Sequence, residues 1–118
     1  MESKDAITAL SALAHDTRLT IFRLLVQAGA TGMSAGHIAR QLGIAASTLS
    51  NNLAILERAG LLQAAREGRS IRYFAQMPAM ARLLAYILED CCGGAPEICA
   101  PVLSALTCCA PSHTEPAA

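Results

Sequence analysis

The hydrophobic positions in the first ninety residues recur with helical spacing in segments that are separated by glycines. A first helix is predicted over residues 6–13. Asp16 has the short polar side chain that favours an N-cap, and a second helix is predicted to follow it. We expect this second helix to bury a face made of Leu19, Phe22 and Val26 and to end at the glycine-rich loop behind it.

The next two helices have the lengths and the separation of a helix-turn-helix. Ser34 is suited to cap a short helix, which Gly43 ends because glycine tolerates a positive φ. The following helix is predicted over residues 46–59, with apolar residues at positions i, i+4 and i+7. These residues are Leu49, Leu53 and Leu56.

A β-hairpin and a further helix complete the pattern. Two short extended segments, 61–66 and 70–75, flank the turn sequence EGR, which is typical of a hairpin. A long helix is predicted from Pro78 into the Cys91-Cys92 pair, with a broad apolar stripe along it. The stripe consists of Met80, Leu83, Leu84, Ile87 and Leu88. The order of elements predicts a mainly α winged helix-turn-helix with a β-hairpin.

The chain divides into a DNA-binding part and a cysteine-bearing part. We expect residues 1–92 to form the winged helix-turn-helix DNA-binding and dimerisation domain, and residues 93–118 to form a C-terminal segment. Prolines are frequent after Gly93, so only residues 102–106 are predicted to form a helical turn. The final sequence APSHTEPAA is predicted to be disordered.

The formal net charge is zero, but the charges are unevenly distributed. Residues 1–76 hold eight Lys and Arg against five Asp and Glu, whereas residues 77–118 hold one against four. A basic N-terminal part favours a nucleic-acid partner. The N-terminus lacks the pattern of a signal peptide, and no apolar run approaches the roughly 18 residues that a membrane helix needs. We therefore expect a cytoplasmic protein without a membrane partner.

Short polar side chains occupy the face of the 46–59 helix opposite its leucines. Ser, Thr and Asn near the start of such a helix can hydrogen-bond to base edges in the major groove or to phosphates. Arginines around the hairpin supply phosphate contacts. The predicted DNA-binding residues are Ser47, Thr48, Ser50, Asn51, Asn52, Arg66, Arg69 and Arg72. The alternative is an ordinary solvated helix face, and the hairpin arginines favour DNA binding over it.

All five cysteines lie in the last 28 residues, as Cys91, Cys92, Cys99, Cys108 and Cys109. In a reducing compartment such a cluster indicates metal binding or redox chemistry rather than a disulfide framework. Thiolates select soft or borderline ions such as Cu(I), Zn(II) and the thiophilic metalloids. A thiol reductase is disfavoured because the chain has neither a Cys-x-x-Cys motif nor a βαβ pattern around its cysteines. A zinc-stabilised interaction module is a third hypothesis, which salt-dependent binding to DNA would separate from a repressor.

Three stretches together resemble the ArsR/SmtB metalloregulators, which are dimeric winged-helix repressors. They are LSALAHDTRLTIFRLL (10–25), IARQLGIAASTLSNNLAILERAGLL (38–62) and REGRSIRYF (66–74). The recognition helix of that family usually carries a Ser followed by two His, where this chain has Ser50, Asn51 and Asn52. The resemblance implies a homodimer built from the first and last helices, which binds a palindromic double-stranded operator.

The resemblance also implies an effector site in the C-terminal cysteines. A subgroup of the family responds to trivalent arsenicals and carries Cys-Cys with another Cys a few residues on, and Cys91, Cys92 and Cys99 look like that arrangement. As(III) and Sb(III) take three thiolates in a pyramid, so three cysteines complete their ligand shell. The sequence therefore predicts a repressor that leaves its operator when As(III) or Sb(III) binds.

Two alternatives with the same fold remain open. Zn(II) or Cd(II) needs a fourth ligand, and the nearest candidates in the sequence are Glu89, Asp90, Glu97, Cys108 and His113. A thiol-redox sensor would instead form a disulfide between Cys99 and either cysteine pair. Cys108 and Cys109 are less certain ligands, because they also suit a second site, a metalloid relay or ligation through the partner subunit.

Overall fold

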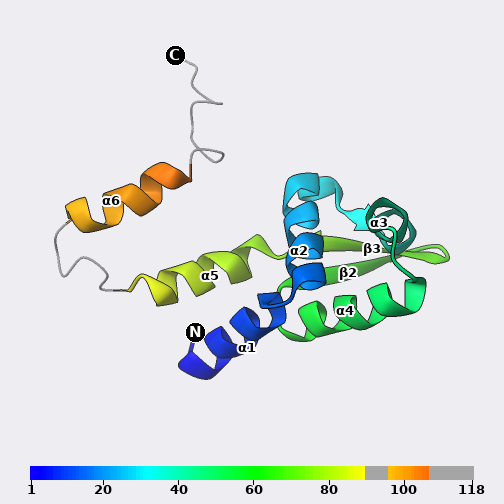
Figure 1. The fold of residues 1–118 in the computed structure, drawn as a ribbon, viewed down its shortest axis with the longest axis horizontal. Helices are drawn as coiled ribbons and strands as arrows, with labels where there is room; N and C mark the ends of the chain where they lie inside the picture. The colour runs from blue at the N-terminus through cyan, green and yellow to red at the C-terminus, as the bar shows by residue number, and fades with distance from the viewer. Residues whose placement is uncertain (90–95, 107–118) are drawn as a thin grey trace, which may run out of the picture. The chain divides into compact units, whose positions relative to one another are not determined.

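The computed structural model describes residues 1–89 and 96–106 (Figure 1). Its elements are α1 (Ser3–Leu13), α2 (Asp16–Ala28), the 3-10 turn η1 (Gly29–Thr31), β1 (Met33–Ser34), α3 (Ala35–Leu42), α4 (Ala46–Arg58), β2 (Leu62–Glu67), β3 (Ser70–Ala75), α5 (Met77–Ile87) and α6 (Pro96–Ala105). The predicted winged helix-turn-helix is confirmed. The chain forms two compact units, Met1–Tyr86 and Ile87–Ala118, and each is described by itself.

Both ends of α3 form as the sequence predicts. The Ser34 hydroxyl accepts a hydrogen bond from the backbone N–H of His37 at 3.2 Å, which satisfies one of the free donors at the helix start. At the other end Gly43 has φ 65° and ψ 36°, a left-handed conformation that costs glycine little. A short turn therefore leads directly from α3 into α4.

The start and the buried face of α2 differ from the prediction. Asp16 is the first helical residue, and His15 occupies the N-cap without a capping side-chain hydrogen bond. Phe22 is buried as expected, but Leu19 and Val26 are 45% and 38% exposed. Apolar residues lie all around this helix, so spacing alone does not identify the face that packs. The buried face consists of Ile21, Phe22 and Leu25.

A three-stranded antiparallel sheet has the order β1-β3-β2. The β2–β3 hairpin, which we call the wing, ends in the two-residue loop Gly68-Arg69, because Glu67 still pairs with Ser70. Gly68 has φ 61°, as tight hairpin turns require at this position. The two-residue strand β1 is too short to produce a sequence pattern, and it was not predicted. In Figure 1, α4 lies along β2 and α2 crosses β3.

The core gathers leucines of α4 against the small residues of α1 and the apolar face of α2. Alanines on α1 let that helix approach its neighbours closely. The buried apolar residues are Ala6, Ala9, Ala12, Ile21, Phe22, Leu25, Met33, Ile38, Leu49, Leu53, Leu56, Leu61, Leu62, Ala79 and Leu83. Together they form one core that the helix-turn-helix and the wing share.

The last predicted helix ends earlier than expected. Helix α5 stops at Ile87, and Leu88 and Glu89 form a turn, so the prediction that it runs into Cys91-Cys92 is wrong. Leu88 and Glu89 favour a helix, but the aspartate, two cysteines and two glycines that follow them in the sequence do not. The predicted stripe also divides, because Leu83 is buried whereas Leu84 and Ile87 are 41% and 48% exposed.

Helix α6 is longer than the single turn predicted for residues 102–106. It begins at Pro96, which suits a first helical position, and it contains Pro101. The predicted disorder of residues 110–118 lies outside the described residues. Across 1–89 and 96–106, no helix combines the length and apolar character that crossing a membrane demands.

Candidate nucleic-acid interface

The N-terminal half of α4 presents polar side chains to solvent. Leu49, Leu53 and Leu56 point into the core and thereby fix which face of the helix is outward. The exposed residues of this half are Ser47, Thr48, Ser50 and Asn51. Their hydroxyl and amide groups lie near the positive end of the helix dipole, which favours a polyanionic ligand.

Asn52 does not belong to this exposed row, and its predicted contact with DNA is contradicted by its burial. The side chain is 6% exposed. Its Oδ1 accepts a hydrogen bond from Arg18 Nη1 at 3.3 Å, and its Nδ2 donates to the carbonyl of Thr48 at 3.0 Å. The sequence carried this signal, because Asn52 is three residues from Leu49 and four from Leu56, on the buried face of the helix.

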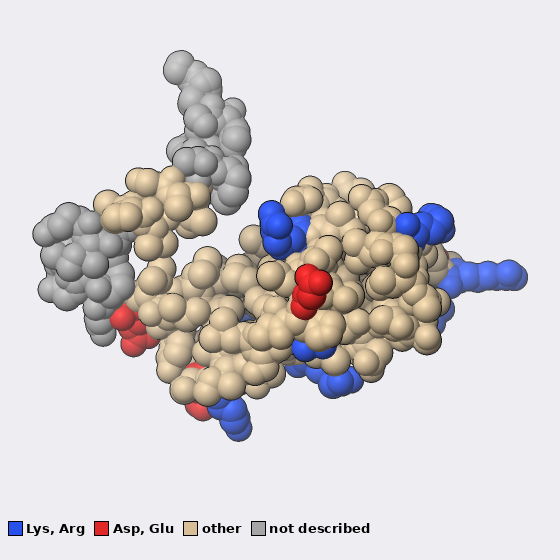
Figure 2. All heavy atoms as spheres, in the orientation of Figure 1, with Lys and Arg blue, Asp and Glu red and all other residues tan. Residues whose placement is uncertain are grey.

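The wing presents two exposed arginines at its tip. Arg69 occupies the loop, and Arg66 makes only a weak 3.5 Å contact from Nη1 to the carbonyl of Gly68. Neither has an ion-pair partner within the part of the chain that the structure describes. Figure 2 shows basic side chains projecting around the end of the molecule where the wing lies. This arrangement can bind phosphate.

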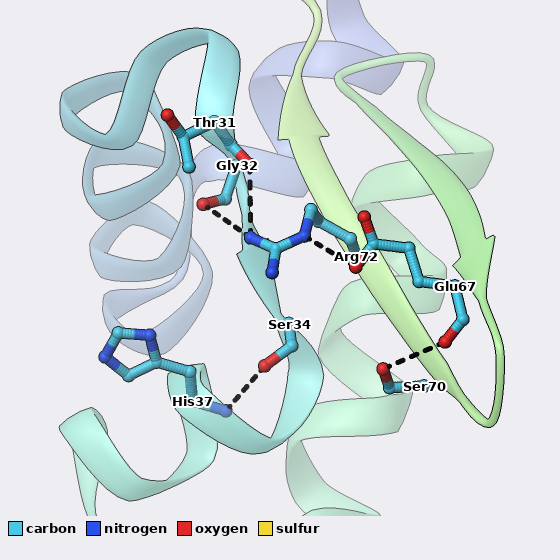
Figure 3. Close-up of polar contacts among 7 residues, drawn as sticks. All are labelled: Thr31, Gly32, Ser34, His37, Glu67, Ser70 and Arg72. Carbon is cyan, nitrogen blue, oxygen red and sulfur yellow. Dashed lines mark hydrogen bonds and ion pairs between the residues drawn. The ribbon is translucent and has the colours of Figure 1, made fainter.

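Arg72 has a structural role within the protein, and its predicted contact with phosphate stays a prediction. Its Nε donates to Glu67 Oε1 at 3.0 Å, and its Nη1 donates to the carbonyls of Thr31 and Gly32 at 3.1 and 3.3 Å (Figure 3). These contacts join the wing to the loop before β1. They also offset the Glu67 carboxylate, which would otherwise repel phosphate beside Arg66 and Arg69.

Arg40 is a further exposed arginine that the sequence did not predict as a site residue. Arg40 lies near the end of α3, the first helix of the helix-turn-helix. In such motifs the first helix crosses the DNA backbone. Because Arg40 is exposed on that helix, it is a candidate phosphate contact.

The phenol of Tyr73 on β3 feels the negative charge of Glu57 on α4. The side chain is half-buried and packs against the core. Burial and, to a smaller extent, the negative charge of Glu57 raise the pKa of its phenol above 10.0. The neutral phenol is therefore the form that the folded protein favours.

The predicted cysteine site falls mostly outside the described residues. Cys91, Cys92, Cys108 and Cys109 lie there, and Cys99 is the fourth residue of α6. Within residues 1–89 and 96–106, the structure brings no three His, Cys, Asp or Glu side chains together for a metal ion. The ligand set Cys91, Cys92 and Cys99 thus stays a prediction.

A helix-turn-helix with a polar second helix beside a basic β-hairpin defines the winged helix-turn-helix class of DNA-binding proteins. Comparisons agree, because a family model described as a helix-turn-helix domain matches residues 13–63. The chain is also 31% identical over 90 residues to the HTH-type transcriptional regulator YgaV of Escherichia coli (strain K12). That match covers 76% of this chain and 89% of YgaV.

Several solved structures are similar over 74% of this chain, among them the following two. The homodimeric winged helix-turn-helix DNA-binding domain of Mb0332 from Mycobacterium bovis, a possible ArsR-family regulator, is 30% identical with a TM-score of 0.61, over 80% of its own length. Reduced HlyU from Vibrio cholerae N16961 is 29% identical with a TM-score of 0.59, over 90% of its own length. The chain belongs to the ArsR-like winged helix-turn-helix transcriptional regulators, which are DNA-binding proteins and not enzymes.

Proposed function

We propose that this protein is a repressor that binds operator DNA as a homodimer and leaves it when As(III) or Sb(III) is bound by Cys91, Cys92 and Cys99. The observation that carries the proposal is the combination of a DNA-binding winged helix with five cysteines that all lie in the last 28 residues of the chain. The DNA-binding class is established by the fold and the relatives. The operator contacts, the dimer and the effector are the proposed parts.

The exposed half of α4 enters the major groove in this proposal. Asn51 can donate to and accept from an adenine edge at the same time, and Ser47 and Ser50 can bond to bases or phosphates. Arg66 and Arg69 contact the phosphates beside that groove. The short side chains of α4 allow its backbone to approach the bases closely.

Exposed apolar residues on α1 and α5 support the homodimer. Ile7 and Leu10 on α1 are 60% and 44% exposed, and Leu84 and Ile87 on α5 are similarly exposed at 41% and 48%. Large apolar side chains on the surface of a small domain are typical of a face that a partner covers. The similar domain of Mb0332 is itself described as homodimeric. A two-fold dimer presents two α4 helices to successive turns of DNA.

The positions of the cysteines in the chain support a sensor role. Cys91 and Cys92 follow the end of α5 at Ile87, and Cys99 comes within the first turns of α6. Three thiolates satisfy trivalent arsenic or antimony, whereas Zn(II) needs a fourth ligand. Binding would restrict the segment between the two helices and shift α5 at the dimer face. A coupling free energy of about 1–3 kcal/mol between effector binding and DNA binding weakens DNA binding by roughly 5- to 150-fold.

The test uses a duplex that the unmodified protein selects from a random-sequence library. Fluorescence anisotropy follows its release during titration with arsenite, antimonite, Zn(II), Cd(II) or peroxide, in a buffer without competing thiols. We expect release by arsenite and antimonite at about one equivalent per subunit. Release by Zn(II), Cd(II) or peroxide, with none by arsenite or antimonite, would contradict the metalloid assignment.

Thiol-redox sensing is the second candidate, and one relative favours it. The similar HlyU structure is described as that of the reduced protein. In that case a disulfide between Cys99 and Cys91 or Cys92 takes the place of the metalloid. Release by peroxide that dithiothreitol reverses, without any response to arsenite, would select this candidate.

A further inference from the structure

A single side chain of α2 connects α1 to the recognition helix α4. Arg18 Nε donates to the carbonyl of Ala12 at 2.6 Å, and Nη2 lies 3.5 Å from the carbonyl of Ser11. Both carbonyls belong to the last turn of α1, where that of Ser11 also accepts from the backbone N–H of Ala14 at 3.2 Å. On its other side the same guanidinium donates from Nη1 to Asn52 Oδ1 at 3.3 Å.

Asn52 completes the connection within α4. Its Nδ2 donates to the carbonyl of Thr48 one turn earlier, at 3.0 Å. It is the buried polar residue of the described ranges, at 6% exposure, and both ends of its amide are occupied. Its neighbour Asn51 is exposed. Successive residues are about 100° apart around a helix, so fixing Asn52 also fixes the direction of Asn51.

Apolar packing and the Arg18 bridge both join α1 to α4. A surface groove of about 380 Å³ runs along the junction of α1 and α4 beside Arg18. Its lining includes Ile7, Ser11, Ile55 and Arg58. The Arg18 guanidinium adds a directional polar link to these non-directional apolar contacts.

We propose that Arg18 is a positioning residue for DNA recognition. Through Asn52 it holds α4 at the rotation that presents Asn51 to base edges, and it ties that rotation to the end of α1. The inference rests on the proposed role of α4 in contacting bases. It assigns to Arg18 and Asn52 a function other than contact with DNA, because their polar groups are already engaged within the protein.

Three roles for these residues predict different binding data. A positioning pair lowers affinity for the selected duplex while leaving affinity for random duplex and the salt dependence unchanged. A base contact loses discrimination at one base pair only. A phosphate contact weakens both duplexes and reduces the slope of log K against log salt by about 0.9.

The experiment measures both affinities and the salt slope for Arg18→Met, Asn52→Ala and the double variant. Measurements are made at a temperature where circular dichroism shows each variant to be folded. We expect each single substitution to weaken binding to the selected duplex about tenfold, as the loss of a hydrogen bond to a charged group implies. The double variant should lose no more than either single one, since both remove the same link.

Asn51→Ala is the matched control, because it removes an identical side chain one position away. It should abolish discrimination at one base pair, and in its background Arg18→Met should cost less than in the unmodified protein, because the contact that Arg18 positions is already lost. Independent losses from Arg18→Met and Asn52→Ala, a reduced salt slope, or lower stability with unchanged DNA binding would overturn the positioning role. If Asn51→Ala leaves every base preference intact, the proposed role of α4 fails, whatever Arg18 does.

Discussion

Tyr73 is a residue whose protonation state matters for the stability of the wing. Its phenol is held neutral by partial burial and by the nearby Glu57, which raises its pKa above the ordinary value of 10.0. The folded protein therefore retains this proton at pH values where the unfolded chain has begun to lose it. The free energy of unfolding is consequently expected to fall as the pH rises through 10.

Tyr73→Phe tests this linkage. The phenylalanine variant lacks the titrating group, so its urea midpoint should decline less between pH 8.5 and 10.5 than that of the unmodified protein. The other titrating groups are common to both proteins and cancel in the comparison. Equal declines in the two proteins would show that Tyr73 does not titrate with a raised pKa.

Gly32 is a second residue with a definite requirement. Its φ is 64° with ψ −168°, and a Cβ at this position would lie 2.5 Å from the carbonyl oxygen of Tyr73 and 2.6 Å from Phe74 Cδ2. Gly29 has the same φ but open space around it.

Gly29→Ala should cost about 1–3 kcal/mol in backbone strain. Gly32→Ala should cost a further 1–3 kcal/mol, roughly, from overlap. Urea unfolding of both variants measures the difference, and equal losses would contradict the close packing.

Side-chain roles were harder to predict than side-chain positions. The polar row on α4 was predictable because the leucines define the opposite face. Asn52 and Arg72 were predicted to contact DNA from their places beside the polar row of α4 and around the hairpin tip, whereas the structure engages both within the protein. The partners of Arg72 are about forty residues away in sequence, at Thr31 and Gly32. No local pattern reveals such a contact.

At the scale of elements, the wing is the part whose electrostatics can be tested separately. Arg66→Ala and Arg69→Ala should each reduce the slope of log K against log salt by about 0.9, because each removes one phosphate contact. The matched control is Arg72→Met combined with Glu67→Gln, which removes one charge of each sign from a pair that is engaged within the protein. It should leave the slope unchanged. A slope that responds to the control as strongly as to Arg69→Ala would contradict this division of roles.

The helices were predicted well where caps and glycines mark their ends. Ser34 and Gly43 fix both ends of α3, whereas α4 begins after Ala45 without a side-chain cap and ends just before Gly60. The prediction was wrong near the C-terminus. Cysteines and acidic residues gave no clear stop for α5, and Pro101 argued against the helix that α6 forms.

At the scale of the whole molecule, the proposed dimer depends on the exposed apolar residues of α1 and α5. Leu10→Glu and Leu84→Glu place a charge on each proposed contact face, and both side chains are more than 40% exposed. The expected result is a folded monomer by sedimentation equilibrium. Binding to a palindromic duplex should weaken by about 100-fold or more, because the second half-site is lost.

Leu19→Glu is the control for this experiment. Leu19 is exposed to a similar degree, 45%, but it lies on α2, outside the proposed face. The variant should remain dimeric. If it dissociated while Leu10→Glu and Leu84→Glu stayed dimeric, the contact face would be on α2.

We propose that Cys91, Cys92 and Cys99 together are necessary and sufficient for arsenite to release the protein from DNA. The most direct measurement is arsenite titration of DNA-bound protein carrying Cys108→Ser and Cys109→Ser, beside protein carrying Cys99→Ser. The first should be released like the unmodified protein, and the second should bind DNA normally and stay bound. Retention of the first on DNA, or full release of the second, would contradict the claim.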